Sequence, residues 1–118
     1  MAADGKQALE AEQVTRLIAE RLNAGDIDGI GELYEDDAVL AYPPDQPTTG
    51  VEAIKAVYRS IAEQGANPTH EKQLPTAHFE DLALTSTVGA DGTGTRAQVL
   101  RRQSDGTWKR IIDRPEAR

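Results

Sequence analysis

The first half of the chain carries apolar side chains at the spacing of amphipathic helices. Within residues 8–22 they recur every three or four positions, which places them on one helix face, and Gly25 follows as a stop signal. A short second helix is predicted after Asp26, which suits an N-cap, and a third after Thr49, which has capping-box spacing to Glu52. The apolar positions of these helices are Ala8, Ala11, Val14, Leu17, Ile18 and Leu22; Ile27, Ile30, Leu33 and Tyr34; and Val51, Ile54, Val57, Tyr58 and Ile61.

The second half of the chain changes to the two-residue alternation that is typical of strands. One short strand is already predicted at residues 36–42, where two prolines end it. Further strands are predicted at 70–81, disturbed by Pro75, and at 82–88, 95–103 and 107–114, with a loop at 89–94 and a turn at 104–106. Helices followed by consecutive strands predict an α+β fold, in which the helices pack on one face of an antiparallel sheet.

Length and composition narrow the class of protein. A chain of 118 residues is the size of one domain, and 38% hydrophobic residues are enough for a core. The net charge of −7 disfavours nucleic acid and anionic membranes as partners, and the absence of cysteine excludes disulfides and thiolate chemistry. No apolar run suits a signal peptide or a membrane span. We therefore expect one cytoplasmic domain over residues 1–118, with flexible ends at about 1–6 and 115–118.

Four segments of the chain resemble a known superfamily. The chain is similar to the nuclear-transport-factor-2-like superfamily, specifically its SnoaL-like bacterial members, and the resemblance covers almost the whole chain. The segments that carry it are NAGDIDGIGELYEDDAVLAYP, TTGVEAIKAVY, LALTSTV and RRQSDGTWKRIIDRP. It implies a cone-shaped, curved antiparallel sheet packed on three N-terminal helices, a pocket inside the cone and often a homodimer. The superfamily includes isomerases, cyclases, epoxide hydrolases, dehydratases and proteins without catalysis, so the resemblance is informative about the fold and weak about the reaction.

The resemblance allows a comparison with ketosteroid isomerase chemistry, position by position. That reaction needs a carboxylate base and hydrogen-bond donors at the enolate oxygen. The family's base position falls on Tyr42, its oxyanion tyrosine on Ile18 and its oxyanion aspartic acid on Gln98. Ile18 can donate nothing, and a neutral tyrosine is a poor proton acceptor at pH 7. The usual ketosteroid isomerase mechanism is therefore not expected, and we interpret Tyr42 as shaping or polarising a pocket.

A second comparison leaves Asp113 as the candidate catalytic base. Limonene-epoxide-hydrolase-like members carry a water-activating aspartate on the last strand, and alignment of the final hairpin places Asp113 there. The other charged residues of that constellation are missing: only Asp81 falls on the preceding strand, and Arg96 on another strand is the one replacement for the arginine. The alternative for Asp113 is a surface or interface ion pair with Arg110 or Arg114.

The sequence thus predicts a site in which Asp113 is the base, and whose ligand-binding side chains are Tyr42, Gln98, Arg96, Tyr58 and His78. No metal or cofactor is expected, because His70 and His78 are the only histidines and have no acidic ligands at metal spacing.

The expected partner is a small apolar or amphipathic organic molecule, bound with or without turnover of the isomerase, cyclase, dehydratase or hydrolase type. The alternative is a non-catalytic dimeric binding or assembly module whose cavity is filled by side chains. A homodimer joined through the sheet is expected in either case, since the strand face with Ala97 and Val99 would be apolar and exposed.

Overall fold

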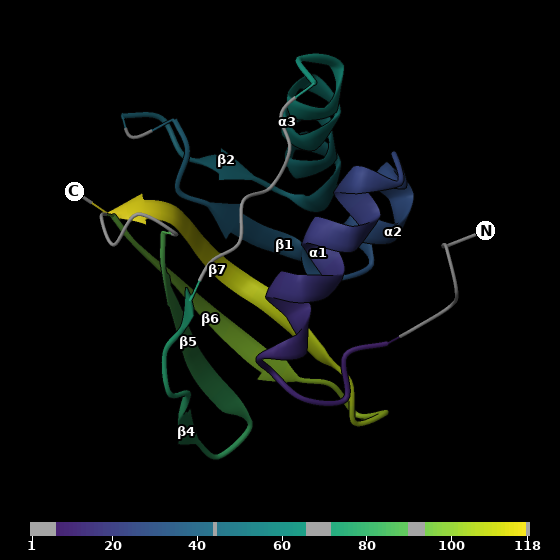
Figure 1. Cartoon of the computed structure of the whole chain (residues 1–118). Coiled ribbons are helices and arrows are strands. Elements are labelled where there is room, and N and C mark those ends of the chain that lie inside the picture. The colour runs from purple at the N-terminus through teal and green to yellow at the C-terminus, as the bar shows by residue number, and fades with distance from the viewer. Residues whose placement is uncertain (1–6, 44, 66–71, 90–93, 118) are drawn as a thin grey trace.

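The helices lie together on one side of a single curved sheet (Figure 1). The computed structural model describes residues 7–43, 45–65, 72–89 and 94–117. In these residues it contains the helices α1 (Gln13–Asn23), α2 (Ile27–Gly31) and α3 (Val51–Glu63), and the strands β1 (Tyr34–Leu40), β2 (Thr48–Thr49), β3 (Lys72–Gln73), β4 (Ala77–Phe79), β5 (Leu82–Val88), β6 (Thr95–Arg102) and β7 (Trp108–Ala117). The predicted α+β class is confirmed.

The sheet runs in the order β2-β1-β7-β6-β5-β3, and β4 also pairs with β5. It does not close on itself, because β2 forms one edge and β3 with β4 forms the other. Neighbouring strands are antiparallel, as predicted, with one exception: β1 and β7 are parallel. A parallel pair needs a long crossover, and here the connection from β1 to β7 includes α3 and the other strands of the sheet.

The core forms where the apolar helix faces meet the inner face of the sheet. Ile30 of α2 and Ile54 of α3 are completely buried, and Leu100 of β6 faces them from the sheet side. The other buried apolar residues are Ala8, Ala11, Val14, Leu17, Ile18, Leu33, Tyr34, Ala38, Leu40, Ala83 and Trp108. No helix in the described part of the chain is long and apolar enough to cross a membrane.

The second helix is shorter than its apolar pattern predicts. It begins after Asp26, whose carboxylate accepts a hydrogen bond from the backbone N–H of Gly29 at 3.0 Å, which is the predicted cap. It ends at Gly31, however, and Tyr34 is the first residue of β1 rather than the last of the helix. The backbone pairing with β7 explains the change, because the carbonyl of Leu33 accepts a hydrogen bond from the N–H of Arg110 at 2.8 Å.

The predicted capping box at Thr49 and Glu52 is wrong. Thr49 is paired with Val39 as part of β2, so it is not available as the N-cap of α3. The N-cap is Gly50, whose φ of 95° lies in a region that favours glycine, and the Glu52 carboxylate lies 3.2 Å from Lys55 instead.

The strand predicted over residues 70–81 is two short strands in the structure. β3 and β4 are separated by residues 74–76, and Pro75 at the centre of this break cannot donate a ladder hydrogen bond. Part of the prediction lies outside the described residues, namely 70–71 of this strand and 90–93 of the predicted loop. The last strand is longer than predicted and continues to Ala117.

Truncation of a core side chain on α3 tests this packing. We expect Ile54→Ala to lower the free energy of unfolding by about 2–5 kcal/mol, because it removes a side chain with 0% exposure and leaves a cavity. Leu9→Ala is the control, since Leu9 is 66% exposed and its loss should change stability by less than about 0.5 kcal/mol. Urea denaturation of both variants measures the difference, and equal losses would contradict the described core.

Candidate functional site

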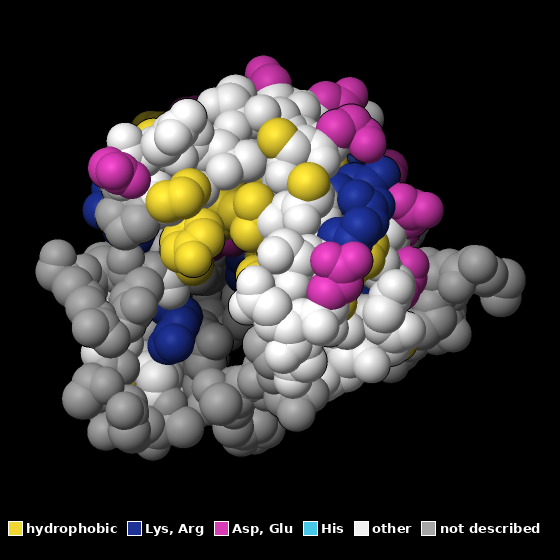
Figure 2. Space-filling view, turned by 90° about the horizontal axis from the view of Figure 1, so that it is seen from above, with side chains coloured by type: hydrophobic (Ala, Val, Ile, Leu, Met, Phe, Trp, Pro, Cys, Tyr) yellow, Lys and Arg dark blue, Asp and Glu magenta, His cyan; other side chains and the backbone are white. Residues whose placement is uncertain are grey.

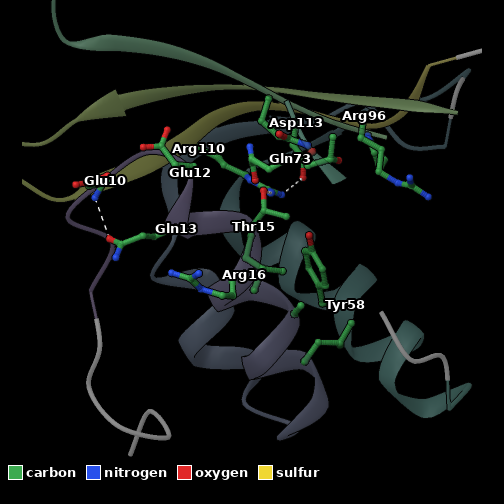
Figure 3. A pocket seen from close by; sticks show the side chains of 16 residues that line it. Glu10, Glu12, Gln13, Thr15, Arg16, Tyr58, Gln73, Arg96, Arg110 and Asp113 are labelled. Atoms are coloured by element: carbon green, nitrogen blue, oxygen red, sulfur yellow. Dashed lines mark hydrogen bonds and ion pairs between the residues drawn. The ribbon is translucent and has the colours of Figure 1, made fainter. Parts of the chain in front are cut away.

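A cavity of about 720 Å³ lies between the inner face of the sheet and the helices α1 and α3 (Figure 3). The space-filling view from above shows hydrophobic side chains gathered beside a hollow in the molecular surface (Figure 2). The helix side of the cavity and the segment before it contribute Glu10, Glu12, Gln13, Thr15, Arg16, Ile18, Ala19, Leu22 and Tyr58, and the sheet contributes Gln73, Thr87, Arg96, Gln98, Arg110, Asp113 and Pro115. The helix side therefore contributes apolar side chains beside several polar and charged ones, and the strands contribute mostly polar and charged side chains.

A hydrogen-bonded cluster of four side chains is centred on Asp113. Its Oδ2 atom accepts hydrogen bonds from the hydroxyl of Tyr34 at 2.5 Å and from Nη1 of Arg110 at 2.7 Å. Nη1 of Arg110 also donates to the hydroxyl oxygen of Tyr34 at 3.1 Å. The hydroxyls of Tyr34 and Tyr58 are 2.7 Å apart, so the cluster reaches from β7 through β1 to α3.

A β-bulge brings Arg110 and Asp113 to the same face of β7. Residues three apart in a regular strand point to opposite faces of the sheet. In this strand, Arg110 is opposite Leu100 of β6 while Ile112 is opposite the preceding residue, so Ile111 is an extra residue. The bulge reverses the alternation between Arg110 and Asp113, so that both charged side chains point inward.

Burial and charge together set the protonation of this cluster. Burial raises the pKa of Tyr58 to about 12, and the nearby Asp113 carboxylate acts in the same direction. Burial also raises the pKa of Tyr34 well above its usual value, with further contributions from Tyr58 and Asp113. For Arg110, burial works to lower the pKa, but Asp113, Tyr34 and Tyr58 together outweigh it, so the pKa is raised above its usual value. The two tyrosines are therefore neutral and the arginine is charged at physiological pH.

The second oxygen of Asp113 has no hydrogen-bond partner among the described residues. Asp113 is 2% exposed, and its Oδ1 atom is buried. Gln98 is the cross-strand neighbour of Asp113 on β6, and its side-chain oxygen accepts a hydrogen bond from the hydroxyl of Thr85 at 2.6 Å. A buried carboxylate oxygen without a donor is costly. Both Asp113 and Gln98 line the cavity.

Four of the six side chains predicted for the site line the same cavity: Asp113, Gln98, Arg96 and Tyr58. Tyr42 lies elsewhere, because β1 ends at Leu40 and the chain then turns toward β2; the tyrosine is 49% exposed. His78 lies on β4 at the sheet edge, where its ring contacts the Trp108 ring edge-on at a centroid distance of 5.7 Å. Neither is among the residues that line the cavity.

Sequence reasoning missed Tyr34 and Arg110 as members of the cluster. Tyr34 had been assigned to the second helix, and Arg110 entered only as an ion-pair partner of Asp113. That ion pair exists at 2.7 Å, but it is buried rather than on the surface. One signal was available, since Arg110 follows Trp108 by two residues and so lies on the same strand face as a large buried side chain.

The fold and the site define a small α+β protein with a cavity between an open, curved sheet and its helices. The family model of the SnoaL-like domain matches residues 14–111, and the chain therefore belongs to this family. This confirms the resemblance seen in the sequence. No curated protein matches the chain significantly.

Solved structures with the same fold include three bacterial proteins. A ketosteroid isomerase-like protein from Erwinia carotovora atroseptica is 19% identical, with a TM-score of 0.71 over 87% of this chain and 89% of the other. An NTF2-like protein of unknown function from Pseudomonas putida is 21% identical, with a TM-score of 0.68 over 91% and 83%. A protein from Catenulispora acidiphila, in complex with S-DNPA, is 19% identical, with a TM-score of 0.67 over 88% and 87%. These similarities show the shared fold.

The raised pKa of Tyr58 predicts a loss of stability at alkaline pH. The unfolded chain loses the tyrosine proton near pH 10, whereas folded Tyr58 keeps it to about pH 12. The contribution of protonated Tyr58 to the free energy of unfolding is therefore complete below about pH 10 and is lost as the pH rises toward 12. We expect the free energy of unfolding, measured with urea between about pH 8 and pH 11, to fall less steeply in Tyr58→Phe than in the wild type. Equal slopes would contradict the raised pKa.

Proposed function

We propose that this protein binds a small, largely apolar organic molecule in the cavity and that Asp113 contacts the polar group of that molecule. The observation that carries the proposal is the buried Oδ1 atom of Asp113, which lacks a partner among the described residues in the wall of a cavity of about 720 Å³. Ligand pockets are typically about 300–1,000 Å³, mostly apolar, with a few placed polar groups. Ile18, Ala19 and Leu22 supply the apolar wall opposite the sheet.

The chemistry that this site favours is general acid/base catalysis with Asp113 as the base. Arg110 and Tyr34 hold the Oδ2 atom, which fixes the carboxylate and leaves Oδ1 as the oxygen available to the ligand or to a water molecule. Isomerase, cyclase, dehydratase and hydrolase reactions all contain a proton transfer of this kind. The usual ketosteroid isomerase mechanism is disfavoured, since it also needs donors at the developing oxyanion and Ile18 in the cavity wall can supply none.

The competing proposal is an assembly module without a ligand, whose cavity would be filled by side chains. The size of the cavity favours the binding function. The complex of the Catenulispora acidiphila protein with S-DNPA adds support, because that protein has the same fold.

A side chain placed inside the cavity tests binding without changing the charged cluster. We expect Ala19→Trp to abolish binding of small molecules that copurify with the wild type, because Ala19 lines the cavity. Glu20→Trp is the matched control, since it adds the same side chain on the exposed side of α1 and should leave binding unchanged. Native mass spectrometry of the three proteins, with thermal shifts against a library of small apolar compounds, measures the effect. Binding that survives in Ala19→Trp would place the ligand elsewhere.

We also propose that two copies of the chain associate through the outer face of the sheet. Leu84 of β5 and Ile112 of β7 are 45% and 48% exposed there, and Val99 lies between them on β6. Adjacent apolar side chains on an exposed sheet face are typical of an interface.

A charge on this face should separate the copies. We expect the wild type to sediment as a dimer at micromolar concentration and Ile112→Lys to sediment as a monomer, since a buried lysine without a partner is costly. Leu9→Lys, on an exposed residue before α1, should remain dimeric. A wild-type protein that is only monomeric at this concentration would refute the proposal.

A further inference from the structure

The direction of every hydrogen bond in the buried cluster follows from its two charged members. The Arg110 guanidinium can only donate and the Asp113 carboxylate can only accept. Tyr34 therefore gives its single hydroxyl proton to Oδ2 of Asp113. Its oxygen then has only lone pairs left, and one of these accepts from Nη1 of Arg110.

Tyr58 must consequently donate to Tyr34. The two hydroxyl oxygens are 2.7 Å apart, which requires one proton between them, and the proton of Tyr34 is already bonded to Asp113. The Tyr58 hydroxyl thus has no proton left for a ligand, and it presents only lone pairs to the cavity that it lines. The raised pKa values of both tyrosines keep this arrangement neutral at physiological pH.

The cluster therefore adds two hydrogen-bond acceptors to its part of the cavity wall: Oδ1 of Asp113 and the hydroxyl oxygen of Tyr58. A ligand carbonyl or an oxyanion would bring a third acceptor to this place, and Oδ1 would stay unsatisfied. A ligand cation would add a buried charge to an ion pair that is already neutral, with a large cost of desolvation. A neutral hydrogen-bond donor meets both requirements, because it can bond to Oδ1 and brings no charge.

Gln98 restricts further which chemical group of the ligand can be the donor. It is the cross-strand neighbour of Asp113 and lines the same cavity, and its oxygen is engaged by Thr85, which leaves its NH₂ group as the donor. A hydroxyl group is the ligand that fits between a carboxylate oxygen and an amide NH₂, because it donates one hydrogen bond and accepts another.

We propose that the ligand of this site is a neutral alcohol or phenol, whose hydroxyl donates to Oδ1 of Asp113 and accepts from the amide of Gln98. The inference rests on the proposed small-molecule function and specifies the polar group of the ligand. It predicts that an alcohol is preferred over the ketone and the methyl ether of the same carbon skeleton, since neither of those can donate.

Matched probes of one skeleton test the preference. We expect 2-tetralol to bind the wild-type protein about tenfold or more tightly than 2-tetralone and 2-methoxytetralin, with the same order for cyclohexanol against cyclohexanone, because a hydrogen bond to a charged acceptor is lost otherwise. Isothermal titration and ligand-observed NMR measure the affinities. Equal or tighter binding of the ketone would refute the hydroxyl preference and leave the proposed function standing. Failure of every probe to bind at millimolar concentration would count against both.

Two variants locate the preference in the cluster. Asp113→Asn can place an NH₂ group where Oδ1 was, so the preference for the alcohol should vanish or reverse. This variant also leaves the buried Arg110 without its charge partner, so a second variant that keeps the ion pair is needed. Tyr58→Phe keeps the ion pair and both proposed partners of the ligand hydroxyl, so 2-tetralol should still bind more tightly than 2-tetralone in this variant. Ser60→Ala removes a hydroxyl from the exposed side of the same helix and should change neither affinity. An unchanged alcohol preference in Asp113→Asn, or its loss in Tyr58→Phe, would overturn the assignment of Oδ1 of Asp113 as the acceptor.

Discussion

The buried ion pair between Arg110 and Asp113 is the interaction on which the rest of this structure depends. Both side chains are almost completely buried, and Nη1 of Arg110 lies 2.7 Å from Oδ2 of Asp113. Further hydrogen bonds offset part of the desolvation cost of a buried pair. Asp113 accepts a hydrogen bond from the Tyr34 hydroxyl. The Nη2 atom of Arg110 donates a hydrogen bond to the Thr15 hydroxyl of α1 at 2.9 Å. The pair therefore constrains the strand that carries it and also the helix and the strand that pack against it.

The same hydrogen bonds fix the walls of the cavity. Thr15 joins α1 to β7, Tyr34 joins β1 to β7, and Tyr58 adds α3 through its bond to Tyr34. Of these elements, α1, α3 and β7 line the cavity together with β3, β5 and β6, so the polar cluster and the apolar core hold the helices at one distance from the sheet. An apolar core alone would favour collapse of the helices onto the strands, whereas a polar cluster requires its own partners at defined distances. The cavity thus depends on the polar cluster as well as on packing.

Sequence patterns predicted most of the elements, because periodicity is a local property. The spacing in α3 and the alternation in β5 matched the structure, and so did the spacing in α1 from Val14 onward, although α1 begins at Gln13 and leaves Ala8 and Ala11 before it. The site was harder to predict. Arg110 and Asp113 are three apart, which in a regular strand means opposite faces, and only the extra residue at Ile111 brings them together. Tyr34 was missed for a related reason: its helical spacing to Ile30 was overridden by the pairing of β1 with β7.

The cluster also explains how a shared fold can favour different chemistry. Stabilisation of an oxyanion requires donors that are free to point at the developing charge. In this chain the Tyr34 hydroxyl donates its proton to Asp113, and the Tyr58 hydroxyl donates its proton to Tyr34. Arg110 can only donate, so it occupies a lone pair of Tyr34 and leaves the hydroxyl protons directed toward the carboxylate. The cluster consequently turns lone pairs toward the cavity instead of protons. A single buried arginine therefore sets the polarity of the site, although the carboxylate is the group that would meet the ligand.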